Sequence, residues 1–155
     1  MAENTLFKTT LNKAMNQCSR REYCRYDILR KLLGWGVEKS DSEKIINILI
    51  KENFINESRY ATAFVRDKFK YNKWGKVKIS TQLHAKHVPP SIIDSSLDSI
   101  DNEAYLDLLK KLITDHIKSV KAKNQYELKA KLLRYGLSKG FESTLLYDIL
   151  NDLEK

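Results

Sequence analysis

One helical pattern occurs three times in this 155-residue chain and limits its fold more than any other feature. Each copy has two aliphatic residues at the i, i+4 spacing of one helix face, followed by a third aliphatic residue beyond the helix. The three copies are Ile28, Leu32 and Val37; Ile79, Leu83 and Val88; and Leu128, Leu132 and Leu137. Because one short helical unit buries little apolar surface, we expect the three units to pack against one another.

Each copy is flanked by further helix-forming segments. A longer helix is expected before each copy, at about residues 4–18, 57–72 and 102–118. A shorter helix is expected after each copy, opening at the capping box Ser40–Glu43, at Pro89–Pro90 and ahead of Leu145. The sequence therefore predicts an all-α fold of three tandem three-helix repeats, residues 1–55, 56–100 and 101–155, in an elongated, curved array.

Several residues indicate where these helices begin and end. Gly36 and Gly136 lie near the helix ends of the first and third copies, where a left-handed glycine commonly stops a helix. His87 takes that place in the second copy and suits the left-handed conformation less well. At the other end of the third copy, Asn124 and Glu127 form a capping pair by sequence.

The charge of the chain suggests a polyanionic partner. Its 28 Lys and Arg outnumber 20 Asp and Glu, giving a net charge of +8 and a pI near 9.4, and nucleic acid is the commonest such partner. No segment has the length and apolar character of a signal peptide or a membrane span, so we expect a cytoplasmic protein without a membrane partner, monomeric when free. Cys18 and Cys24 are expected to be free thiols.

The middle repeat carries the most uneven charge. On a helical projection of its first helix, six apolar residues share one broad side: Tyr60, Ala61, Phe64, Val65, Phe69 and Tyr71. Opposite them runs a basic stripe that continues into the next helix: Arg59, Arg66, Lys70, Lys73, Lys76 and Lys78. A solvated helix face is the alternative explanation, but such faces usually mix charges of both signs, so we favour contact with phosphate or with an acidic protein.

A second basic cluster surrounds the first copy. Its members are Arg20, Arg21, Arg25, Arg30 and Lys31, with Glu22 and Asp27 among them. The stems of Arg30 and Lys31 could instead cover apolar surface. Trp35 and Trp74 lie near helix ends, where packing at a repeat junction is favoured over stacking on a base.

The sequence contains no arrangement of residues typical of catalysis. Its glycines form neither a phosphate-binding loop nor a dinucleotide fingerprint. His84 and His87 have no cysteine nearby, and His116 is isolated, so no metal site is expected. We therefore expect a protein that is not an enzyme and holds no cofactor.

The first two thirds of the chain resemble a known family, RecX. Asn56–Arg66 is similar to the family's acidic-rich segment and R-Y-A-x-x-F-V-R motif, and Gly75–Leu83 is similar to its G-x-x-x-I-x-x-x-L motif. Ser19–Tyr23 and Leu29–Leu32 resemble its opening S/A-R-R-E and L-R-x-K-L elements. The likeness covers residues 10–100, and the third unit matches by pattern alone. The departures are Asn56 for Asp, Cys24 for Ser and His87 for Gly.

The resemblance implies a regulator of the RecA recombinase in DNA repair, homologous recombination and the SOS response. Such a protein binds in the groove of the RecA filament on single-stranded DNA and inhibits strand exchange, ATP turnover and stimulated repressor cleavage. The residues by themselves leave two alternatives open: a sequence-tolerant DNA-binding helical module, and a helical-repeat scaffold for protein interactions.

Overall fold

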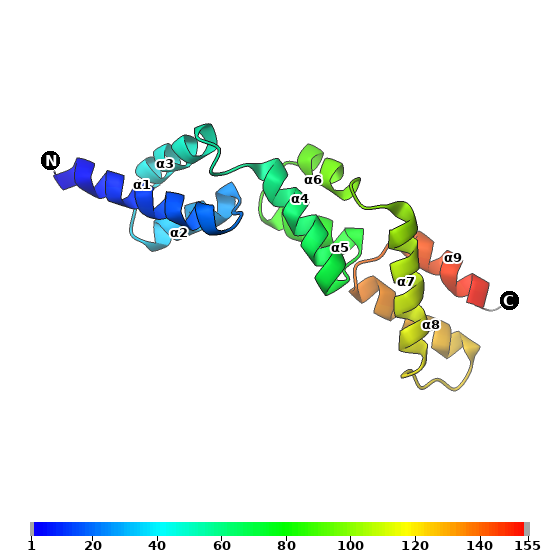
Figure 1. The fold of residues 1–155 in the computed structure, drawn as a ribbon. Coiled ribbons are helices and arrows are strands. Elements are labelled where there is room, and N and C mark those ends of the chain that lie inside the picture. Colours follow the sequence, from blue (N-terminus) through cyan, green and yellow to red (C-terminus); the bar gives the residue numbers. More distant parts are fainter. Residues whose placement is uncertain (1, 154–155) are drawn as a thin grey trace.

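The computed structural model describes residues 2–153 and is helical throughout (Figure 1). Within that range the chain forms nine α-helices and one π-helical turn, and no strand. The helices follow one another in three groups of three along an elongated, bent row, with the first and third groups at opposite ends (Figure 1). The predicted all-α fold of three-helix repeats is confirmed. None of the described helices is both long and apolar enough to cross a membrane.

The first repeat comprises α1 (Ala2–Arg20), α2 (Arg25–Gly34) and α3 (Lys39–Lys51) around a core of its own. Gly36 is left-handed as predicted, with φ +86°. The capping box predicted at Ser40–Glu43 is wrong, because α3 begins at Lys39 and its N-cap residue makes no side-chain hydrogen bond. The backbone N–H of Val37 donates to the Leu32 carbonyl, so the turn closes early and the next helix starts two residues later.

The second repeat comprises α4 (Glu57–Asp67), the π-helical turn η1 (Lys68–Asn72), α5 (Lys76–Ala85) and α6 (Pro90–Leu97). The helix expected at residues 57–72 therefore exists, but its last turn is π-helical. The wider turn changes the register of the helix face. Tyr71, predicted on the apolar side, is consequently 70% exposed. As expected from the sequence, Pro90 opens the helix that follows α5.

The third repeat comprises α7 (Asn102–Ile117), α8 (Gln125–Ser138) and α9 (Ser143–Leu153). The predicted cap is confirmed, because the Asn124 side chain accepts a hydrogen bond from the backbone N–H of Glu127.

The predicted end of α8 is wrong by four residues. The helix runs on past Gly136, and Gly140 is the left-handed residue, with φ +93°. Phe141 therefore takes the core position expected for Leu137, which is 47% exposed. Gly136 is buried inside the helix, and its position has no room for a side chain, because a Cβ there would lie 2.2 Å from a methyl group of Leu146.

The second and third repeats are joined through their main chains. The backbone N–H of Gly75 donates to the Lys139 carbonyl at 2.8 Å, and that of Val77 donates to the Gly140 carbonyl at 2.9 Å. One hydrophobic core extends through both repeats. These two repeats therefore form a single packed unit.

The first and second repeats are joined chiefly by side chains. Among the described residues, no backbone–backbone hydrogen bond connects them. The buried Cys24 side chain of the first repeat enters the core of the second. Three polar contacts complete the junction: Arg59 Nε to Glu22 Oε1 at 2.5 Å, Lys86 Nζ to Asp27 Oδ1 at 2.6 Å, and the Arg25 N–H to Glu57 Oε1 at 2.9 Å.

Candidate nucleic-acid interface

Arg59, the first residue of the basic stripe expected on the middle repeat, does not lie on the same surface as the rest. Arg59 lies at the start of α4, beside the linker from the first repeat, and turns inward. Its guanidinium contacts the Glu22 carboxylate and donates to the Asn53 carbonyl at 3.0 Å. The structure therefore places the charge of Arg59 in the junction between repeats, where an acid from another repeat pairs with it.

The next members of the stripe face solvent. The Arg66 side chain is 68% exposed, and the Asp67 carboxylate lies 3.4 Å away on the same helix. Lys70 is exposed in the π-helical turn, with its Nζ 5.2 Å from the ring centre of Tyr71. An exposed ion pair between sequence neighbours contributes little energy, so both cations remain available to a partner.

Two of the remaining stripe residues, Lys73 and Lys78, gather with other lysines near Trp74, which packs on the shared core of the second and third repeats as the sequence predicted. The Nζ atoms of Lys68 and Lys78 lie 5.0 and 4.7 Å from its indole ring. Lys139 comes from the third repeat, and its Nζ donates to the Asn72 carbonyl at 3.1 Å. We call Lys68, Lys73, Lys78 and Lys139 with Trp74 the Trp74 cluster.

The Trp74 cluster concentrates positive charge. Within the described part of the chain, none of its four lysines forms an ion pair. Burial, together with the neighbouring charges of Lys78 and Lys73, lowers the pKa of Lys139. Mutual repulsion of this kind favours a bound anion. Lys76 lies apart, with its Nζ 5.0 Å from the ring of Tyr105 at the same junction.

Two lysines of the Trp74 cluster were missed by sequence reasoning. Lys68 is not part of the predicted stripe, but it is the first residue of the π-helical turn and its Nζ lies near the Trp74 ring. Lys139 belongs to another repeat and arrives through the main-chain contact at Gly75. Lys139 directly precedes Gly140, the left-handed glycine that follows α8, and this position was its only sequence signal. The sequence pattern had placed the end of that helix at Gly136 instead.

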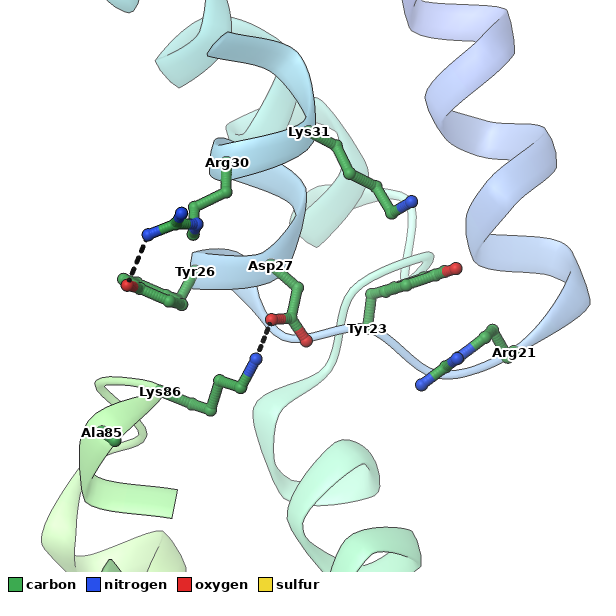
Figure 2. A pocket seen from close by; sticks show the side chains of 8 residues that line it. All are labelled: Arg21, Tyr23, Tyr26, Asp27, Arg30, Lys31, Ala85 and Lys86. Atoms are coloured by element: carbon green, nitrogen blue, oxygen red, sulfur yellow. Dashed lines mark hydrogen bonds and ion pairs between the residues drawn. The ribbon is translucent and has the colours of Figure 1, made fainter. Parts of the chain in front are cut away.

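The second predicted cluster separates into three locations. Arg20 is exposed in the last turn of α1, and Arg25 lines a hollow together with Glu43 and His87. The other three members line a cavity of about 520 Å³ between the first and second repeats, which Figure 2 shows. We call it the junction cavity, and its lining residues are Arg21, Tyr23, Tyr26, Asp27, Arg30, Lys31, Ala85 and Lys86.

The charge of these surfaces suits the binding of an anion. Among the described residues, no group of three or more His, Cys, Asp or Glu side chains is placed to hold a metal ion. Cations with nearby aromatic rings are instead the groups that contact phosphates and bases of single strands.

Comparison with known proteins identifies the family. A family model for the second three-helix domain of RecX matches residues 56–97. The regulatory protein RecX of Vibrio campbellii is 31% identical over 128 residues, which cover 83% of this chain and 81% of that protein. The chain belongs to the RecX family. A second RecX protein, from Clostridium beijerinckii, is 27% identical over 97% of this chain and 70% of its own length.

Solved RecX structures share the fold. A crystal structure of regulatory protein RecX superposes with a TM-score of 0.87, at 22% identity, covering 97% of this chain and 75% of that one. RecX from Lactobacillus salivarius superposes with a TM-score of 0.83, at 22% identity, covering 99% of both chains. RecX proteins are regulatory proteins rather than enzymes, so the chain is a regulator.

Proposed function

We propose that this RecX-family protein binds the RecA filament on single-stranded DNA and restrains it, mainly by inhibiting strand exchange, ATP hydrolysis and stimulated repressor cleavage. The observation that carries the proposal is a basic region centred on the second repeat, namely Arg66, Lys70 and the Trp74 cluster, in a chain of this family. A filament of nucleic acid and protein is the polyanion on which such a region would be stabilised.

The proposed mechanism is a wedge in the filament groove. The three repeats form an elongated row, so successive repeats would meet successive protomers (Figure 1). Modest contacts made at once add up through effective concentration. A bound row would then block growth or promote disassembly. This function places the protein in the cytoplasm with its target.

Charge reversal in the basic region tests the proposal. The double variant Arg66→Glu and Lys70→Glu should lower affinity for RecA assembled on poly(dT) by on the order of tenfold, because phosphate contacts and their released counterions are lost. Co-sedimentation measures the binding, and ATP hydrolysis by RecA measures the restraint. The fold should be unchanged, because both side chains are exposed.

A control of equal charge makes this test specific. Lys44 and Lys51 are exposed on α3, outside both basic surfaces, and their double change to Glu alters the net charge equally. Unchanged inhibition in the Arg66 and Lys70 variant refutes the assignment of the basic region. Binding to bare poly(dT) as tight as to the filament indicates a DNA-binding module, and sedimentation that needs no DNA indicates a protein scaffold.

A further inference from the structure

The junction cavity is lined by cations from two repeats and contains one carboxylate. We propose that it is a binding site for a phosphodiester of a single DNA strand, and that the Asp27 carboxylate holds its affinity down. The proposal deepens the proposed function and rests on it for the choice of DNA as the ligand.

The charges in the cavity are unbalanced. Arg21, Arg30, Lys31 and Lys86 face a single acid, Asp27. Lys86 Nζ lies 2.6 Å from Asp27 Oδ1, so these two charges offset one another. Among the described residues, the other three cations form no ion pair. Three positive charges therefore line the same cavity without an acidic partner, and an anion would relieve their repulsion.

Two tyrosine rings hold the cationic groups in place. The Arg21 guanidinium and the Lys31 ammonium lie 4.8 and 5.1 Å from the ring centre of Tyr23. Arg30 donates a hydrogen bond to the Tyr26 hydroxyl at 3.0 Å. In Figure 2, Tyr26 and Arg30 lie on one side of Asp27, and Tyr23, Lys31 and Arg21 lie on the other, while Lys86 points toward Asp27 from the end of α5. Because the cations are already positioned, a ligand loses less side-chain entropy on binding.

The size and chemistry of the cavity favour a phosphodiester. A guanidinium presents a planar fork of donors that matches phosphate oxygens. The volume of about 520 Å³ lies in the ordinary range for sites that take a small molecule or one nucleotide unit. A single strand can turn one unit inward and leave its unpaired base against a tyrosine ring, whereas the bases of a duplex stay paired and stacked in its interior.

Asp27 is the group that opposes this ligand. Its side chain is 17% exposed, at the first turn of α2, and it lines the same cavity as the three unpaired cations. A carboxylate this close both neutralises Lys86 and repels a phosphate. Replacing Asp27 with Asn keeps the shape and removes the charge. The change should therefore strengthen binding, which a merely structural role for Asp27 would not do.

The test measures affinity for a fluorescent oligothymidylate of about twelve nucleotides, a length within the range that single-strand sites span. Fluorescence anisotropy follows its binding to the full chain at fixed low salt. Asp27→Asn should bind on the order of threefold to tenfold more tightly, as expected for removal of one like charge nearby. The double variant Arg30→Gln and Lys31→Gln should bind at least about tenfold more weakly, since two charge-assisted contacts are lost.

The matched control is Lys44→Gln with Lys51→Gln, which removes the same charge from the same repeat outside the cavity. Equal losses in the two double variants, or weaker or unchanged binding by Asp27→Asn, would overturn the proposal. Polyglutamate serves as a competing probe. If its binding depends on Arg30 and Lys31 more strongly than that of the oligonucleotide, the cavity serves an acidic protein and the DNA assignment is wrong.

The proposed function can fail separately. A protein that binds the oligonucleotide through the cavity but does not sediment with the RecA filament refutes the proposed function and supports this site. Sedimentation and inhibition that survive in the Arg30 and Lys31 variant, together with undiminished oligonucleotide binding, refute this site and leave the function in place.

Discussion

Replacing Gly75 with alanine has two opposing effects on stability: it reduces the entropy of the unfolded chain, and it places a Cβ against the third repeat. The backbone of Gly75 has φ −77° and ψ 168°, which any residue adopts, so alanine introduces no backbone strain. By reducing the entropy of the unfolded chain, the change alone would stabilise the protein by about 0.4–1 kcal/mol. The surroundings reverse that sign, because an added Cβ would lie 2.3 Å from the Gly140 carbonyl oxygen and 2.5 Å from the Phe141 nitrogen.

The size of the expected loss in the free energy of unfolding follows from the contacts that the added Cβ disrupts. Both clashing groups are backbone, so the third repeat must move away from the second. That movement disrupts the hydrogen bonds from the Gly75 and Val77 N–H groups to Lys139 and Gly140, each worth about 0.5–1.5 kcal/mol net. Strain from overpacking adds about 1–3 kcal/mol. After the entropic gain is subtracted, we expect a net loss of about 1–5 kcal/mol.

Urea unfolding monitored by Trp74 fluorescence, in a Trp35→Phe background, measures this loss at the junction itself. Gly34→Ala is the matched control, because no atom lies within 4 Å of the added Cβ and the residue ends a helix. That change should be neutral or stabilising by up to about 1 kcal/mol. If Gly75→Ala is as well tolerated as Gly34→Ala, the two backbones do not approach as described and the reasoning fails.

Two further predictions concern titratable groups in and beside the first junction. Burial raises the pKa of Glu57, so the folded protein holds this proton more tightly than the unfolded chain, and stability falls as pH rises from the ordinary Glu value through the raised one. Glu57→Gln should therefore raise the free energy of unfolding at pH 7 but not at pH 4 in urea titrations, and equal effects at both would contradict it. Burial also raises the pKa of Cys24 to about 12 and that of Cys18 above its usual value. Both thiols should react with an aromatic disulfide reagent at pH 8 only as the protein unfolds, and rapid labelling of the native protein would show that they are accessible.

The helices and their order could be predicted from the sequence because the signals are local. Apolar spacing within one helix and the side-chain cap at Asn124 involve residues a few positions apart, and both were confirmed. The end of α8 could not be predicted, since Gly136 and Gly140 both suit a helix end. Packing of Leu146 against Gly136, ten residues away, decides between them.

The candidate binding surfaces were predicted only as sets of residues on single helices. The exposure of Arg66 and Lys70 follows from helical periodicity, and the structure agrees. Arg59 lies on the same stripe, yet an acid 37 residues earlier pairs with it. Whether a cation is free or paired depends on groups brought near by other repeats, and no periodicity within one helix contains that information.

The sequence by itself determined that this chain folds into three helical repeats with a basic middle. Only the tertiary structure decided which cations meet. Lys139 joins Trp74 because two backbones touch at Gly75, and Lys86 meets Asp27 because the second repeat docks beside the first. Local patterns depend on neighbours along one helix, whereas an electrostatic site depends on distances of a few ångströms between segments far apart in the chain.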